Sequence, residues 1–80
     1  MFKMYIEELS KKLVSGKPVF IEDEYEEAIV KFVYDKDEKR TRTWIKRKGI
    51  AEHEIPQSEE IVLEIQLGGK EVNKDRYDKY

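Results

Sequence analysis

Residues 28–48, AIVKFVYDKDEKRTRTWIKRK, carry the pattern that decides the fold. β-Branched and aromatic residues fill residues 28–34 and recur in residues 40–48, which is typical of strands. The five residues between them, 35–39, are all charged and favour a turn. The sequence therefore predicts an antiparallel hairpin of two strands, at 28–34 and 40–48.

The hairpin is expected to have one apolar and one cationic face, because successive side chains of a strand point to opposite sides. If Ile45 points to the core, Trp44, the only tryptophan, points outward between cations. The same outer face of the neighbouring strand carries Lys31. The predicted binding face consists of Lys31, Arg40, Arg42, Trp44, Lys46 and Lys48.

The segments around the hairpin predict helices at both ends of the chain. Before it, apolar residues recur at helical spacing and Gly16 favours a stop; they are Phe2, Tyr5, Ile6, Leu9 and Leu13. At the other end, Asn73 is expected to cap a short helical turn that runs to Tyr80.

Further strands are expected at three places. Residues 19–21 predict an edge or entry strand, and residues 50–55 predict a short strand or an irregular edge. Residues 61–67 predict a strand with one buried face, because Ile61, Leu63, Ile65 and Leu67 alternate with other residues.

Together these patterns predict a single α+β domain over residues 1–80. One N-terminal amphipathic helix packs on a small antiparallel sheet of three to five strands, and a short C-terminal helical turn follows. The chain contains no cysteine, which excludes disulfides and thiolate metal sites. The N-terminal residues include acids where a signal peptide is apolar, and no apolar run approaches the roughly 18 residues of a membrane span. A cytoplasmic protein without a membrane partner is expected.

Charge is segregated along the chain. Residues 36–48 carry a net charge of +5, whereas residues 1–35 carry −3 and residues 49–80 carry −4. The cations and the tryptophan indicate contact with nucleic acid, through phosphate neutralisation and base stacking, or with an acidic protein surface. The alternative without a partner is an edge hairpin whose charges prevent aggregation.

The acidic cluster Glu22–Glu27 has several interpretations. A solvated turn is the simplest, and the spacing does not match a calcium-binding loop. The cluster could also mimic nucleic-acid phosphates for a protein partner, or pair with the basic hairpin within the molecule or across a homodimer.

Catalytic patterns are not found. His53 is the only histidine, and no serine has a base nearby in a triad-like arrangement. We therefore expect no catalytic residues, no metal and no cofactor. The chain is expected to be a small non-enzymatic binding module that contacts nucleic acid through its basic, tryptophan-containing strand. The alternatives are a protein-binding modulator or inhibitor of the viral or mobile-element accessory type, or a structural homo-oligomeric protein.

Overall fold

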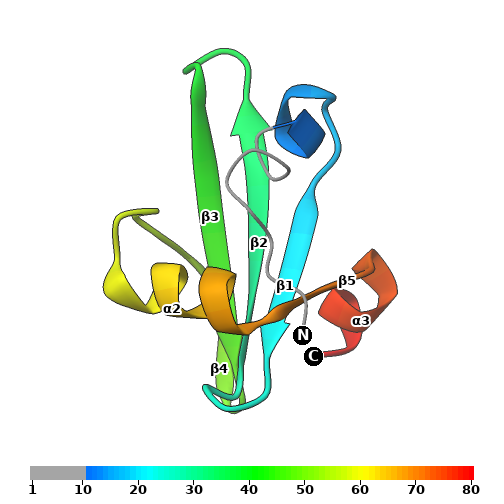
Figure 1. Cartoon of the computed structure of the whole chain (residues 1–80), viewed down its shortest axis with the longest axis vertical. Coiled ribbons are helices and arrows are strands. Elements are labelled where there is room, and N and C mark those ends of the chain that lie inside the picture. The colour runs from blue at the N-terminus through cyan, green and yellow to red at the C-terminus, as the bar shows by residue number, and fades with distance from the viewer. Residues whose placement is uncertain (1–10) are drawn as a thin grey trace.

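The computed structural model describes residues 11–80 (Figure 1). Its elements are β1 (Val19–Asp23), β2 (Ala28–Asp35), β3 (Arg40–Arg47), β4 (Ile50–Ile55), α2 (Glu60–Gly68), β5 (Lys70–Val72) and α3 (Lys74–Lys79). The five strands form one sheet in the order β4-β3-β2-β1-β5, and all neighbours are antiparallel. The predicted α+β class with a small antiparallel sheet is confirmed. Within residues 11–80, no helix combines the length and apolar character needed to cross a membrane.

The predicted hairpin is formed by β2 and β3. Their register runs from Ala28 opposite Arg47 to Asp35 opposite Arg40. The Asp35 Oδ1 atom closes the turn by accepting hydrogen bonds from the backbone N–H groups of residues 37 and 38, at 2.9 and 3.1 Å. Lys39 ends the turn with a φ of 54°, in the left-handed region that chain reversal requires here.

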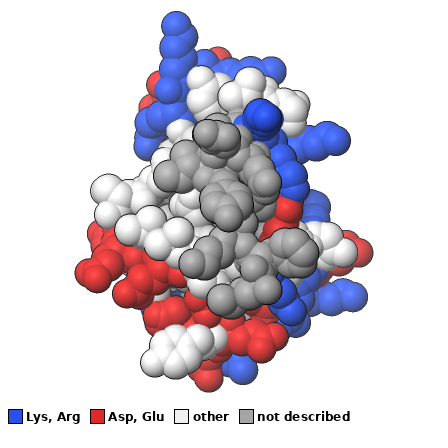
Figure 2. All heavy atoms as spheres, viewed as in Figure 1, with Lys and Arg blue, Asp and Glu red and all other residues white. Residues whose placement is uncertain are grey.

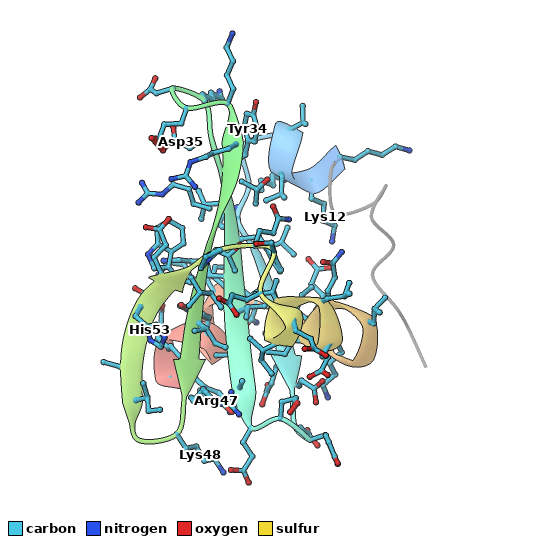
Figure 3. All side chains as sticks on the ribbon, turned by 90° about the vertical axis from the view of Figure 1, so that its left-hand side faces the viewer. Lys12, Tyr34, Asp35, Arg47, Lys48 and His53 are labelled. Carbon is cyan, nitrogen blue, oxygen red and sulfur yellow. The ribbon has the colours of Figure 1, made fainter. Side chains whose placement is uncertain are left out.

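Helices cover both faces of the sheet, on opposite sides in Figure 3. α2 and the helical residues 11–14 lie on the face where the main core forms. That core consists of Leu13, Val19, Ile21, Ala28, Val30, Phe32, Ile45, Val62 and Ile65. On the other face, α3 places Tyr77 against Phe20 and Ile29 in a second, smaller cluster. Successive side chains of β2 point to opposite faces of the sheet, so β2 buries apolar residues on both faces.

The two predicted terminal helices are found in part or in full. Residues 11–14 are helical, Leu13 is buried, and Gly16 follows with a φ of 88°. The other apolar positions predicted for that helix lie outside the described residues. At the C-terminus, the Asn73 side chain accepts a hydrogen bond from the Arg76 N–H at 2.9 Å and caps α3, as predicted.

The strand predicted at 61–67 is wrong, because this segment is the helix α2. Val62 and Ile65 are buried, whereas Leu63 and Leu67 are 52% and 49% exposed. Five of the seven residues are apolar, so their positions fit a period of two as well as a helical period. The acids Glu59 and Glu60 ahead of the segment, and the glycines after it, are the end signals that favour a helix.

Two strand positions also differ from expectation. β1 is the first strand of the chain, which agrees with the entry alternative predicted for residues 19–21, but it lies between β2 and β5, so the edge alternative is wrong. The three-residue β5 was not predicted and forms one sheet edge, with the predicted strand 50–55, now β4, at the other. The α2–β5 connection requires Gly69, because a Cβ atom there would lie only 2.7 Å from the Glu22 carbonyl oxygen.

Candidate binding face

Four of the six residues predicted for binding come together on one face of the sheet. Lys31 of β2 lies opposite Trp44 of β3, and Arg42 and Lys46 flank Trp44 on the same side of β3. These four residues are called the Trp44 face below. Arg40 lies at the start of β3, beside the hairpin turn, and Lys48 lies in the turn after β3. These two cations therefore lie at the two ends of β3.

The Trp44 side chain is half-buried and lies between two cations. The Lys31 Nζ atom is 4.8 Å from the centre of the indole ring, and the Arg42 Cζ atom is 5.1 Å from it. Each contact of this kind contributes about 0.5–1 kcal/mol at exposed sites. The two contacts therefore favour this orientation of the indole on the sheet.

Carboxylates of the edge strand β4 pair with these cations. Arg42 donates to both carboxylate oxygens of Glu54, from Nε at 2.8 Å and from Nη2 at 2.7 Å. Lys31 lies 3.2 Å from the Glu52 carboxylate. The Arg42 guanidinium lowers the pKa of the Glu54 carboxyl. The Trp44 face is therefore zwitterionic rather than simply cationic, which the net charge of residues 36–48 does not indicate.

α3 completes the site from the C-terminal end of the chain. Tyr77 is buried, and its ring centre lies 5.0 Å from that of Phe20. Its hydroxyl donates a hydrogen bond to Glu52, which is the largest reason that the pKa of Glu52 is lowered. Lys46 donates to the Tyr77 carbonyl oxygen at 2.8 Å and lies over the Tyr77 ring. The predicted cap at Asn73 indicated a helix here, but no sequence signal placed that helix on this face.

A pocket of about 460 Å³ opens between α3 and the centre of the sheet. Its walls combine aliphatic, aromatic and charged side chains, and Lys31, Lys46 and Glu52 belong to both the pocket and the ion-pair system above. The lining residues are Pro18, Phe20, Lys31, Val33, Lys46, Glu52, Lys74, Tyr77 and Asp78.

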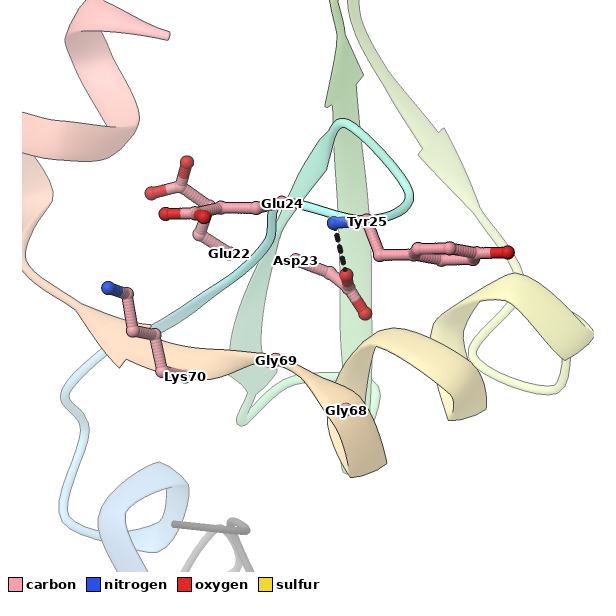
Figure 4. A pocket seen from close by; sticks show the side chains of 7 residues that line it. All are labelled: Glu22, Asp23, Glu24, Tyr25, Gly68, Gly69 and Lys70. Carbon is pink, nitrogen blue, oxygen red and sulfur yellow. Dashed lines mark hydrogen bonds between the residues drawn. The ribbon is translucent and has the colours of Figure 1, made fainter. Parts of the chain in front are cut away.

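The acidic cluster divides into two parts. Glu22 and Asp23 are buried strand residues with structural partners, so a solvated turn is the wrong interpretation for these two. Residues 24–27 do form a turn, closed by the Asp23 Oδ1 atom, which accepts from the Tyr25 N–H at 2.9 Å. Figure 4 shows the pocket beside this turn, of about 440 Å³. Within residues 11–80, no group of three or more histidine or carboxylate side chains is arranged to hold a metal ion.

Charge is also segregated in space. Figure 2 shows lysine and arginine side chains around the end of the molecule formed by the β2–β3 turn, and acidic side chains over α2 and toward the opposite end. Comparison of the chain with protein-family models, with curated proteins and with solved structures found no match. Function is therefore inferred from the geometry and charge of this chain.

Proposed function

We propose that this chain is a small non-enzymatic binding module whose Trp44 face contacts a protein partner. The observation that supports this proposal is a half-buried indole fixed between two cations that are themselves fixed by carboxylates. Tryptophan and arginine are the residues most enriched among those that dominate interface energies. A side chain that is already ordered loses less conformational entropy on binding, so this arrangement favours affinity.

The charge balance favours a protein surface over nucleic acid as the partner of this face. Glu52 and Glu54 lie beside Lys31 and Arg42, and a phosphate approaching either cation would meet a carboxylate. A protein surface with its own mixture of charges and apolar groups can match such a zwitterionic pattern, because complementary charges fix the register of an interface.

Affinity capture with matched variants tests the proposal. The wild-type chain, Trp44→Ala and Val14→Ala are used as baits in nuclease-treated lysate of the source cells. Val14 is a suitable control, because it is 71% exposed and belongs to the helical segment on the other side of the sheet. A protein retained by the wild type and by Val14→Ala but lost from Trp44→Ala is the expected result. If Trp44→Ala retains the same proteins as the wild type, the Trp44 face is not the binding surface.

Nucleic acid is the second candidate, and the turn residues are the observation that favours it. Lys36, Lys39 and Lys48 are exposed, and none of them forms an ion pair with another residue of 11–80. They remain available for phosphates at the two ends of β3. A gel shift at about 50 mM salt, where phosphate-driven affinity is high, tests this candidate with duplex and single-stranded probes. Binding that weakens in Lys36→Ala/Lys39→Ala supports it, and no shift with any probe contradicts it.

A cytoplasmic location is part of the proposal. The chain has no cysteine, and small domains of secreted proteins commonly depend on disulfides. The main core and the ion pairs of this fold need no oxidising compartment to form.

A further inference from the structure

The outward side of α2 carries a stripe of alternating acidic and apolar side chains. Glu60, Leu63, Glu64 and Leu67 follow spacings of three and four residues and therefore share one helix face. Leu63 and Leu67 are 52% and 49% exposed, whereas the core side of the same helix buries Val62. Two leucines one turn apart are thus each about half open to solvent.

The turn between β1 and β2 lies beside α2. The Asp23 side chain approaches Gly68, where an added Cβ atom would lie 3.2 Å from Asp23 Oδ2. Tyr25 belongs to this turn and is 93% exposed. Tyr25 lines one pocket with Gly68 at the end of α2, and in Figure 4 its ring points away from the Glu22 and Glu24 carboxylates. The turn therefore adds a large aromatic side chain to the open apolar surface.

The carboxylates around these apolar side chains repel each other. Burial raises the pKa of the Glu64 carboxyl, and the charges of Glu26 and Glu60 raise it further. Among residues 11–80, none of these three forms an ion pair. The carboxylates Glu52 and Glu54 of β4, which lie beside the Trp44 face, differ, because each has a cation beside it. In the described part of the chain, the α2 surface thus has an excess of negative charge that no ion pair balances.

We propose that this surface docks a protein segment in which lysine or arginine residues flank apolar side chains. The apolar residues of the partner cover Leu63, Leu67 and Tyr25, and its cations meet Glu26, Glu60 and Glu64. Charge complementarity identifies this partner. A second copy with its own α2 in the interface would place carboxylates against carboxylates, and anionic lipid or nucleic acid would be repelled in the same way.

The α2 surface lies on the opposite side of the sheet from the Trp44 face (Figure 3). A partner on one side therefore leaves the other side free. The chain can hold two partners at once, and binding at α2 does not depend on the function proposed for the Trp44 face.

A titration with a designed peptide tests the docking surface. The probe is a helical peptide of about 14 residues made of leucine and lysine, and the control peptide has glutamate in place of each lysine. With ¹⁵N-labelled full chain, the lysine peptide is expected to shift the amide signals of Tyr25 and residues 60–67, and the glutamate peptide is expected to shift none.

Three variants separate the contributions to this binding. Leu63→Gln/Leu67→Gln and Glu60→Gln/Glu64→Gln are each expected to weaken the lysine peptide about tenfold or more, whereas Trp44→Ala is expected to leave its affinity unchanged. Glutamine favours helix and these positions face solvent, so the fold is expected to persist, as circular dichroism will show.

Three outcomes would overturn the proposal. The first is a peptide that shifts signals only outside residues 24–27 and 60–68. The second is equal affinity for the wild type and Leu63→Gln/Leu67→Gln, since binding would then be non-specific charge attraction. The third is a wild-type dimer in sedimentation that Leu63→Gln/Leu67→Gln abolishes, because the occupant of the surface would then be a second copy of the chain.

Discussion

Arg76 donates two hydrogen bonds to Glu22, from Nε to Oε1 at 2.7 Å and from Nη2 to Oε2 at 2.6 Å. The Glu22 side chain is 5% exposed, whereas that of Arg76 is 52% exposed. The Arg76 guanidinium lowers the pKa of the Glu22 carboxyl, although burial opposes this effect. Because the pair joins α3 to β1, it also holds Tyr77 over the Trp44 face.

Removing Arg76 is expected to destabilise the protein in a pH-dependent way. In Arg76→Leu, the buried Glu22 carboxylate loses its partner, and an unsatisfied buried group of this kind costs about 1–3 kcal/mol. Since the folded pKa of Glu22 is lowered, the pair stabilises the fold above the ordinary value of 4.5 and loses that effect as the pH falls below it. Urea unfolding at pH 7 and pH 3 measures the change.

The matched control for Arg76 is Lys74→Leu on the same helix. Lys74 pairs with Asp78 at 2.6 Å, but both side chains are more than half exposed. Losing this ion pair is therefore expected to change the free energy of unfolding little. If Arg76→Leu destabilises the protein equally at both pH values, its contribution is packing rather than the ion pair.

Alkaline pH is expected to weaken the docking of α3 through Tyr77. Burial raises the pKa of the Tyr77 hydroxyl, and the Glu52 carboxylate that it faces raises it further. A raised folded pKa means that the stabilising effect is complete below the ordinary value of 10 and is lost as the pH rises above it. Thermal unfolding between pH 8 and pH 11 measures this loss.

Tyr77→Phe keeps the ring on Phe20 but removes the hydroxyl. It is expected to cost about 1.5 kcal/mol at pH 8, the low end for a hydrogen bond to a charged group, because Glu52 remains about one-third exposed. The variant is also expected to lose less stability than the wild type above pH 10. Parallel pH curves for the two proteins would contradict the role given to the hydroxyl.

Because residues 60–68 form a helix, alanine substitutions of Ile65 and Leu63 are expected to have different effects on the free energy of unfolding. Ile65 is fully buried in the main core, so Ile65→Ala is expected to cost about 2–5 kcal/mol. Leu63 is 52% exposed, so Leu63→Ala is expected to cost less than about 1 kcal/mol. A strand with Leu63 on its core side would make both substitutions severe, and chemical denaturation distinguishes the two results.

Local patterns predicted the hairpin and the capped helix α3, whereas contacts between distant segments decided the identity of residues 61–67 and the short strand β5. The turn at residues 35–39 and the strands around it interact with their own neighbours in the chain, so charge and alternation were sufficient. Residues 61–67 fit two periods, and the packing of Val62 and Ile65 against β1 and β2 selects the helix. The short β5 has a single apolar residue, Val72, so its own sequence does not indicate a strand. It follows α2 directly and pairs with the edge of β1.

The candidate site shows the same division. The pleat of β2 and β3 was enough to predict that Lys31 lies beside Trp44 on one face of the sheet. The carboxylates that neutralise this face come from β4, and Tyr77 comes from the far end of the chain. Pairing partners of this kind depend on the topology, so the sequence indicated a cationic face where the structure has a zwitterionic one.

Glu64 is expected to be a residue whose charge destabilises the fold. Since its folded pKa is raised, the ionised carboxylate is disfavoured in the folded chain above that pKa, and protonation removes the penalty as the pH falls through it. Glu64→Gln is therefore expected to raise the melting temperature at pH 7 and to have no effect near pH 4. Glu24→Gln, which removes another exposed carboxylate, is the control. A melting temperature that is lower for Glu64→Gln at pH 7 would mean that the carboxylates around α2 do not repel each other, and the negative surface proposed for docking would lose its physical basis.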